Sequence, residues 1–317
     1  MLDIDMPEMD GLQTLSAIKK LMPALPVIMC SGLLEKGNSY SIKSLLGGAS
    51  DYVSKPLVVK ESANLEIFRK EIIKKIKSLC GNLGSLGIVP KIIISERGTT
   101  STRVFKEGVE ILAIGVSTGG PKALAEVIPL FPADFPVPIV IVQHMPPIFT
   151  KTLAESLAKK SNIDVQEAFV GAKLQPGVAW VAPGGYHMAL VRKQNQIELV
   201  MNENPPENSC RPSVDVLFRS VAEVFGPRAL AIVLTGMGQD GFEGAKAVRQ
   251  AGGQVFVQDE ASSVVWGMPG VIAKAGIANR ILPLTEMAGI IQSEILRSRT
   301  RKARPRGRNG GDENASC

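Results

Sequence analysis

The 317-residue sequence is poor in several residue types that mark common binding sites. Aromatic residues make up 5% of it, fewer than we expect of a surface that stacks nucleic-acid bases. Its four cysteines are widely separated and form no CxxC pair, which argues against a zinc site or a disulfide framework and fits a reducing compartment. No apolar run approaches the roughly 18 residues of a membrane span, and the first residues do not resemble a signal peptide. We therefore expect a cytoplasmic protein without membrane insertion.

Positive charge is concentrated at the C-terminal end. Residues 297–317 contain seven Lys or Arg and two acidic residues, which account for most of the net charge of +6. This segment has almost no apolar side chains to offset the entropy of ordering it, so we predict a disordered basic tail. A solvated tail is the simpler interpretation. Contact with nucleic acid is the alternative, and we do not expect it.

The rest of the chain alternates apolar runs with helical patterns, in two segments. Residues 1–80 form the shorter segment, and residues 109–296 form the longer one. Between them, residues 81–108 are rich in Gly, Ser and Thr and predict a linker. Continuous apolar strands separated by amphipathic helices predict an α/β fold with a doubly wound, mostly parallel sheet that is covered on both faces.

Three polar residues of the longer segment follow three predicted strands. Ser117 follows "EILAIGV", His144 follows "VPIVIVQ", and Asp240 lies just beyond "ALAIVLTG". Because the carboxyl ends of parallel strands meet at one edge of a sheet, we expect these side chains to lie together. A serine hydroxyl is a weak nucleophile until an imidazole takes its proton, and a carboxylate orients that imidazole. The pattern therefore favours a Ser-His-Asp triad.

The residues around Ser117 fit this chemistry. Gly115, Gly119 and Gly120 leave room for a substrate near the backbone, and the helix that follows directs free N–H groups toward developing negative charge. In the turn "TGMG", the backbone N–H of Met237 is a candidate oxyanion donor.

Each member of the triad has a simpler interpretation. Taken alone, a serine before a glycine pair is more often a helix cap or a phosphate contact than a nucleophile. His187 is the other histidine, and we predict that it is a loop or rim residue. Asp215, on the apolar face of "SVDVLF", and Asp259, before "EASSVVWGMPG", compete with Asp240 for the role of the acid.

Several strings of the longer segment, in order, carry a resemblance to a known family. They are "AIGVSTGGPKAL", "VIVQHMPPIFT", "VAPGGYHM", "RPSVDVLF", "LTGMGQDG" and "VQDEASSVVWGMPG". Over most of residues 111–270 the chain resembles the chemotaxis protein-glutamate methylesterase family (CheB), in which a response-regulator receiver is joined to a Ser-His-Asp esterase.

The resemblance implies a role for each member of the triad. Ser117 would be the nucleophile, His144 the general base and Asp240 its orienting acid, with the Met237 backbone helping to hold the oxyanion. The substrate would be a glutamate γ-methyl ester on the cytoplasmic helices of a methyl-accepting chemoreceptor. Certain receptor glutamines would be hydrolysed to glutamate by the same chemistry, and no metal or organic cofactor would be needed.

The shorter segment resembles a flavodoxin-like receiver domain of a two-component system. The string "LDIDMPEMDGL" matches the phosphoacceptor segment, with Asp3 as the acceptor, and Ser31 and Lys55 match the hydroxyl residue and lysine of the phosphorylation switch. A chemotaxis histidine kinase would be the phosphodonor. In this family the unphosphorylated receiver covers the esterase cleft.

The receiver match is partial. The printed sequence begins inside the acceptor strand, so the acidic pair that would hold the expected Mg²⁺ beside Asp3 is missing from it. We therefore expect a truncated receiver whose true start lies upstream, and basal esterase activity that does not depend on a phosphodonor.

Two other functions compete with the esterase. One is a non-catalytic, phospho-switched regulator whose second domain binds a partner or nucleic acid, and the basic tail favours it. The other is a nucleotide-binding domain built on "GVSTGG", which lacks the spacing of a dinucleotide fingerprint and the lysine of a P-loop.

Overall fold

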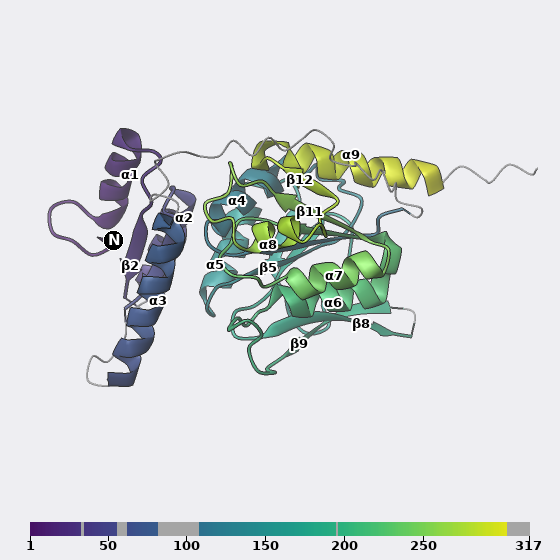
Figure 1. Ribbon diagram of the computed structural model, residues 1–317, viewed down its shortest axis with the longest axis horizontal. Coiled ribbons are helices and arrows are strands. Elements are labelled where there is room, and N and C mark those ends of the chain that lie inside the picture. The colour runs from purple at the N-terminus through teal and green to yellow at the C-terminus, as the bar shows by residue number, and fades with distance from the viewer. Residues whose placement is uncertain (33–34, 56–61, 82–107, 195, 303–317) are drawn as a thin grey trace, which may run out of the picture.

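The structure is a computed structural model that describes residues 1–32, 35–55, 62–81, 108–194 and 196–302. Figure 1 shows two α/β units, a small N-terminal one and a large one. Residues 82–107 of the predicted linker lie outside the described residues, as do residues 303–317 of the predicted tail. Within the described part of the chain, no helix is both long and apolar enough to cross a bilayer.

The N-terminal unit is a three-stranded parallel sheet in the order β1-β2-β3, with its helices in alternation. Its elements are β1 (Leu2–Asp3), α1 (Gly11–Leu21), β2 (Ile28–Ser31), α2 (Glu35–Leu46), β3 (Asp51–Ser54) and α3 (Ser62–Cys80). Helix α1 begins with a capping box in which the Asp10 side chain accepts from Gln13 N at 2.8 Å.

The large unit follows the predicted alternation of strand and helix. Its elements are β4 (Ile111–Val116), α4 (Gly120–Val127), β5 (Ile139–Gln143), α5 (Phe149–Ala158), β6 (Asp164–Glu167), β7 (Val178–Val181), β8 (His187–Lys193), β9 (Gln196–Asn202), α6 (Val214–Phe225), β10 (Ala229–Val233), α7 (Phe242–Gln250), β11 (Gln254–Gln258), α8 (Met268–Lys274), β12 (Arg280–Leu282) and α9 (Leu284–Lys302).

Seven of these strands form one sheet in the order β12-β11-β10-β4-β5-β7-β6, and every pair in it is parallel. Strands β8 and β9 form a separate antiparallel hairpin. Helix α9 lies above the sheet and helices α6 and α7 lie below it (Figure 1). The predicted doubly wound α/β fold is therefore confirmed.

The core explains why the strands read as unbroken apolar runs. Along β4, Ile111 and Ala113 belong to the hydrophobic cluster that contains α6 and α7, whereas Leu112 and Ile114 belong to the cluster that contains α4, α5 and α9. Successive side chains of a strand point to opposite faces, so burial of both faces demands an apolar residue at every position.

The strand order reverses direction at β4. The chain moves from β4 to β5 on one side and later returns to β10 on the other. Loops that leave neighbouring strands in opposite directions open a crevice beyond the carboxyl ends of those strands, where ligands bind in open α/β sheets.

The predicted C-terminal boundary is wrong by a few residues. We expected the tail to begin at residue 297, but α9 continues to Lys302. Within this extension Ser298 is buried, and its hydroxyl accepts a hydrogen bond of 3.0 Å from the backbone N–H of Val109. The basic residues of this stretch are therefore spaced along a helix that anchors the start of the large unit.

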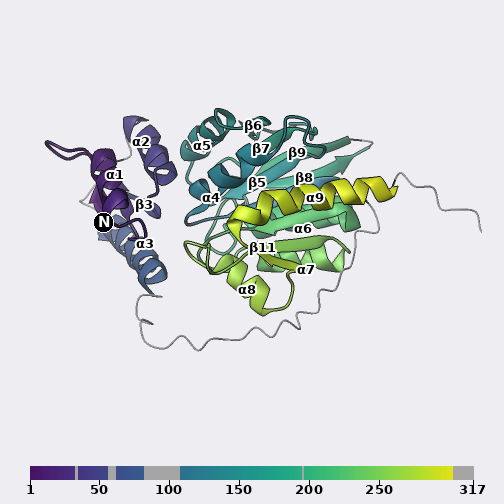
Figure 2. The same ribbon diagram turned by 90° about the horizontal axis from the view of Figure 1, so that it is seen from above.

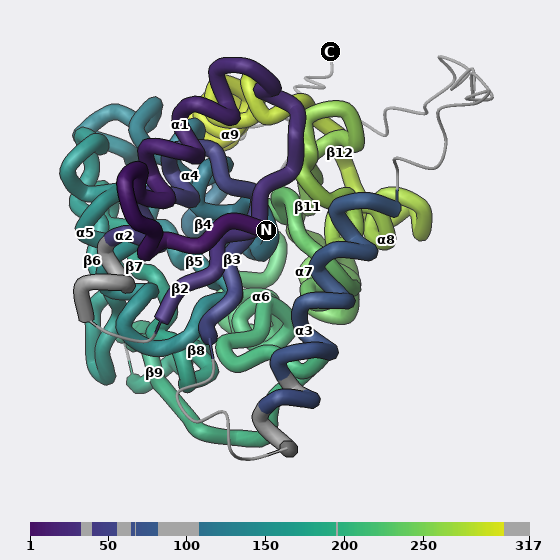
Figure 3. The backbone as a smooth tube through the Cα atoms, turned by 90° about the vertical axis from the view of Figure 1, so that its left-hand side faces the viewer, coloured from purple at the N-terminus to yellow at the C-terminus, as the bar shows by residue number. Residues whose placement is uncertain are grey.

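The two units pack against each other through apolar side chains. Helix α2 lies against α4 and α5, as Figure 2 shows from above. The rings of Tyr52 and Phe149 lie 4.9 Å apart across this contact. A small cluster of Ile28, Val53 and Leu79 of the first unit packs on Val265 of the second. Figure 3 shows the N-terminal unit in front of one end of the large unit.

Helix α7 packs closely against α6 at Gly244, which has no space for a side chain. A Cβ there would lie 2.6 Å from Phe218 Cβ and 3.1 Å from Asp215 Cα. Gly244→Ala should therefore lower the free energy of unfolding by about 1–3 kcal/mol. Gly289 of α9 is the matched control, since a Cβ there meets nothing within 4 Å.

Gly289→Ala should raise the free energy of unfolding by about 0.5–1 kcal/mol, because alanine favours a helix more than glycine does. Urea denaturation of the two variants and the parent protein measures both effects. Equal shifts of the same sign would contradict the packing argument.

Candidate active site

Ser117 lies at the point where the sheet reverses direction. It follows β4, and its backbone N–H donates to Thr235 O, just beyond β10, at 3.0 Å. The N-cap of α4 is Gly119, with φ of 78°, and no side chain caps this helix. Ser117 is therefore not a helix cap. Among the described residues its hydroxyl makes no hydrogen bond, so it is available to a reactant.

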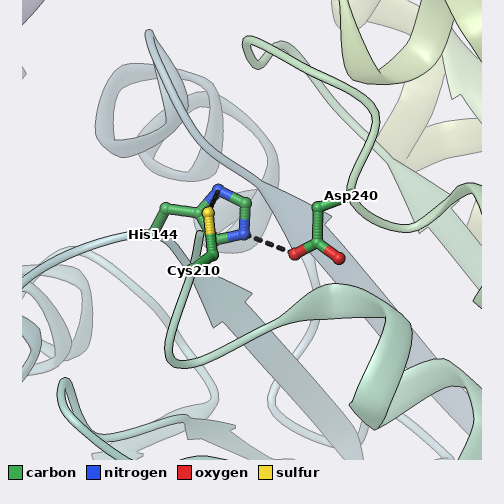
Figure 4. A group of neighbouring side chains, drawn as sticks. All are labelled: His144, Cys210 and Asp240. Carbon is green, nitrogen blue, oxygen red and sulfur yellow. Dashed lines mark hydrogen bonds and ion pairs between the residues drawn. The ribbon is translucent and has the colours of Figure 1, made fainter. Parts of the chain in front are cut away.

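His144 follows the neighbouring strand β5, and its backbone N–H donates to Val116 O at 3.2 Å. Its Nε2 lies 2.7 Å from Asp240 Oδ2, and its Nδ1 lies 3.5 Å from Cys210 Sγ (Figure 4). A carboxylate accepts hydrogen bonds, so the Nε2 nitrogen carries a proton and Nδ1 holds the lone pair of the neutral ring. Nδ1 is thus the atom that is able to take a proton.

Asp240 is 2% exposed and sits at the N-terminus of α6. Besides His144, it accepts from Ser213 Oγ (2.8 Å), Val214 N (2.7 Å), Gly241 N (3.0 Å), Asp215 N (3.1 Å) and Asn208 Nδ2 (3.2 Å). Donors at a helix N-terminus favour a negative charge. Both carboxylate oxygens are therefore held in place, and the carboxylate holds the imidazole in turn.

The electrostatics of this pair follow from those contacts. Burial alone would lower the pKa of His144, but hydrogen bonds and charge interactions with Asp240 and Cys210 outweigh burial and raise that pKa to about 9. Burial alone would raise the pKa of Asp240, but His144 and the donors of α6 lower it to about 2. Over most of the pH range the two side chains form a buried ion pair.

Ser117, His144 and Asp240 line one cleft of about 460 Å³, together with Met237 and Cys210. The Met237 backbone N–H makes no hydrogen bond within the described part of the chain, as an oxyanion donor requires. The hydrogen bond from Ser117 to the imidazole is not formed here, and such contacts often tighten only when substrate binds. The four predicted esterase residues thus share one cleft.

The two aspartates that were alternatives to Asp240 as the acid of the triad make different contacts. Asp215 is buried in α6, where it accepts from Gly244 N at 2.7 Å and Asn208 Nδ2 at 2.9 Å, and burial raises its pKa to about 6. Asp259 accepts from Ser262 N at 3.0 Å and so closes the turn that follows β11. Neither bonds to His144, so neither orients the base.

The prediction for His187 is wrong. It begins strand β8 and is buried, with Nδ1 accepting from Ser213 N at 3.2 Å and Nε2 lying 3.1 Å from Pro205 O. It therefore supports the loop that leads into α6, and hence the cradle of Asp240. The glycine-rich turn before it suggested a rim position, because a sequence does not show which loops fold back over a residue.

The receiver residues gather at the carboxyl edge of the smaller sheet. The Lys55 ammonium forms an ion pair with Asp3 Oδ2, and Ser31 is buried nearby at the end of β2. Burial alone would raise the pKa of Asp3, but the hydrogen bond and charge of Lys55 hold it below its usual value.

The expected Mg²⁺ has few ligands among these residues. Asp3 Oδ1 is buried without a hydrogen-bond partner among the described residues, as a metal ligand would be. A six-coordinate cation needs more than one such oxygen from the protein and its partners. The described residues form no cluster of three ligating side chains around Asp3, so they do not by themselves fit the ion.

The first unit also reaches the cleft of the second. Asp51 Oδ2 accepts from Thr118 Oγ1 at 2.7 Å, and Gly119 N donates to Ser50 O at 3.1 Å. Lys75 of α3 holds the same carboxylate from the other side, with Nζ 2.9 Å from Asp51 Oδ1. The receiver therefore occupies two hydrogen-bond donors immediately after Ser117.

Sequence reasoning missed several residues of the cleft, including Gln143, Cys210 and Asn208. Asn208 and Ser209 adopt left-handed backbone conformations with φ of 51° and 63°, which turn the loop so that Cys210 meets His144. An asparagine before a serine hints at such a turn. Nothing local indicates that the turn folds over a strand end more than sixty residues away.

Comparisons with known proteins agree with this geometry. The family model described as CheB methylesterase matches residues 112–291, and that of the response regulator receiver domain matches residues 1–64. A relative from Trichodesmium erythraeum is 50% identical over 93% of this chain and 84% of its own length, and one from Nocardioides is 42% identical over 94% and 82%. Both are named protein-glutamate methylesterase/protein-glutamine glutaminase.

A solved structure also matches the large unit. The crystal structure of the Thermotoga maritima CheB methylesterase catalytic domain is 39% identical, with a TM-score of 0.58, and covers 58% of this chain and 98% of its own. Family model, relatives and structure point to the same unit that carries the Ser117 cleft. The chain therefore belongs to the CheB methylesterase family, with a receiver domain at its N-terminal end.

Proposed function

We propose that this chain hydrolyses glutamate γ-methyl esters on methyl-accepting chemoreceptors and converts specific receptor glutamines to glutamate. The observation that carries the proposal is the buried His144–Asp240 pair, 2.7 Å apart, in the cleft that also holds the unbonded Ser117 hydroxyl. Membership of the family and the names of its relatives support the choice of substrate.

Acylation begins when Ser117 Oγ attacks the carbonyl carbon of the ester. His144 Nδ1 takes the hydroxyl proton while Asp240 stabilises the charge that forms on the ring. The Met237 N–H stabilises the oxyanion of the tetrahedral intermediate. The imidazolium then returns its proton to the departing methoxide, and methanol leaves.

Deacylation repeats these steps with water as the nucleophile. His144 accepts a proton from the water, the hydroxide attacks the acyl carbon, and the proton returns to Ser117 Oγ as the glutamate is released. A glutamine substrate follows the same course with ammonia as the leaving group. Each step uses side chains and backbone groups of this chain.

We further propose that the receiver controls access to the cleft. Its Asp51 and Ser50 bind the donors beside Ser117, so the closed arrangement blocks the approach of a receptor helix. By resemblance, a chemotaxis histidine kinase would be the phosphodonor and Asp3 the acceptor beside Lys55. Because the described residues do not by themselves fit the Mg²⁺ of that step, we expect the basal activity of this chain to be set by the contacts of Asp51 and Ser50 and not by a phosphodonor. Lys55 follows the carboxyl end of β3, the strand that begins at Asp51, so a change at the Asp3–Lys55 ion pair would reach Asp51 along this strand.

The nucleophile is tested by Ser117→Ala. Methanol release from methylated receptor membranes should fall by about 10⁴-fold or more, because the acyl-enzyme has no oxygen to form on. Ser293→Ala, at an exposed position of α9, is the control and should retain activity. A Ser117→Ala protein that releases methanol at the parent rate would favour a non-catalytic regulator or another nucleophile.

The pKa values predict the pH profile. The neutral form of His144 is the base, so kcat/KM should rise with pH, reach half of its plateau near pH 9 and level off only above that pH. In Asp240→Asn the pKa of His144 should return toward its usual range, so the midpoint moves to lower pH while the plateau falls by about 10⁴-fold. A parent profile that is flat between about pH 6 and pH 9 would contradict this assignment.

The same pair predicts the pH dependence of stability. The pKa of His144 lies above its ordinary value of 6.5, so its contribution is full below 6.5 and lost as pH rises through about 9. The pKa of Asp240 lies below its ordinary value of 3.8, so its contribution is present above 3.8 and lost as pH falls through about 2. Thermal unfolding of the parent and Asp240→Asn should differ most between these limits.

The closed arrangement is tested by Asp51→Ala. Loss of the Thr118 hydrogen bond and of the Lys75 ion pair should shift the receiver toward the open position and raise basal methanol release by about tenfold. Glu66→Ala, on the exposed face of the same receiver helix as Lys75, is the matched control and should not change activity. Unchanged activity of Asp51→Ala would mean that the contact does not restrict the cleft.

A further inference from the structure

The side chain of Gln143 touches the backbone of both residues proposed as nucleophile and base. Gln143 ends strand β5 and is 2% exposed. Its Nε2 donates to Ser117 O at 3.0 Å and to His144 O at 3.1 Å. The proposed chemistry makes no use of this side chain.

These two acceptors determine the orientation of the amide. Carbonyl oxygens only accept, so the amide nitrogen must face them and Oε1 must point away. Oε1 lies in the space left by Gly120, where a Cβ would be 1.9 Å from it. Among the described residues this buried oxygen has no hydrogen-bond partner, which costs about 1–3 kcal/mol. Stability alone does not explain a buried amide held in this way.

The Gln143 amide lies where the backbone hydrogen bonds between β4 and β5 end. Strands β4 and β5 pair as far as Val116 and Gln143, and the last rung is the bond from His144 N to Val116 O. Beyond it, Ser117 N turns to Thr235 O on the opposite side. The two catalytic strand ends therefore have no further rung between them, and the Gln143 amide supplies the next link across the gap.

We propose that Gln143 is a positioning residue that fixes the distance between the strand end carrying Ser117 and the strand end carrying His144. The inference rests on the catalytic roles proposed above for these residues. Gln143 lines the cleft but is 2% exposed, and its amide bonds the backbones of these residues and not their reacting side chains. Through the two carbonyl oxygens it sets where the Ser117 hydroxyl stands relative to His144 Nδ1.

A positioning role has a specific kinetic consequence. A displacement of about 1 Å between reacting groups lowers a rate by as much as 10²-fold. Because Gln143 is 2% exposed, its replacement by a side chain of similar length should change the surface of the cleft little, so loss of the link should lower kcat and leave KM nearly unchanged. The pH profile should keep its midpoint, because Gln143 does not titrate and the His144–Asp240 contact is intact.

Gln143→Met in the full chain tests the proposal, since methionine has a similar length and cannot donate. Labelling of Ser117 by a fluorophosphonate should slow by about 10- to 100-fold, and kcat for methanol release should fall to match, with KM within about twofold. Asn279→Leu is the control. Asn279 lies before β12, at the edge of the sheet opposite the cleft, and its Oδ1 accepts from Val255 N near the start of β11 at 2.8 Å.

Asn279→Leu should lower thermal stability as Gln143→Met does, because it also removes a hydrogen bond from a side chain to a neighbouring strand, yet it should label at the parent rate. Labelling of Gln143→Met at the parent rate, well below its unfolding temperature, would overturn the positioning role. Equal slowing in both variants would overturn it as well, because the effect would then be general loosening. If the parent protein itself is not labelled at Ser117, the nucleophile is misassigned and the proposed function fails first.

Discussion

The active-site cleft depends on one contact, the hydrogen bond between His144 and Asp240. It joins the loop after β5 to the loop after β10, two segments that the chain places almost a hundred residues apart. Its strength comes from burial and from the donors at the start of α6, which hold the carboxylate in its charged form. The N-terminus of α6 therefore fixes the Asp240 carboxylate, and the carboxylate in turn fixes the His144 imidazole.

The topology of the sheet explains why these groups meet at all. At β4 the connections to the neighbouring strands leave in opposite directions, and Ser117 stands at that point, with Thr235 and Met237 of the loop after β10 beside it. Glycines at 120 and 236 leave room for the side chains of Gln143 and Ser117 in this crowded edge. The nucleophile is thus held by backbone hydrogen bonds on both sides, while its hydroxyl remains unbonded.

The receiver uses the same edge. Its contacts with Thr118 and Gly119 lie one and two residues beyond Ser117, and they are reinforced by Lys75 and by the packing of Val265. A carboxylate and a carbonyl oxygen occupy donors that a substrate would meet. The apolar contacts around Tyr52 and Phe149 stabilise the arrangement without depending on charge, so the polar contacts are the part that a change of charge in the receiver is able to alter.

The fold class and the position of the triad were predictable from the amino-acid sequence. Unbroken apolar runs and amphipathic helices predicted the parallel doubly wound sheet, because burial on both faces leaves no position for a polar residue. The strand-end positions of Ser117, His144 and Asp240 predicted the edge at which they gather. The spacing of residues in the sequence did not settle which aspartate orients the base, and the tertiary structure shows that Asp240 and not Asp215 faces the imidazole. It also shows that His187 is buried and that α9 extends to Lys302. Only the folded chain brings Gln143 and Cys210 to the catalytic groups. The reason is that periodicity reports which face of an element is buried, whereas these contacts depend on how loops from distant strands fold over one another.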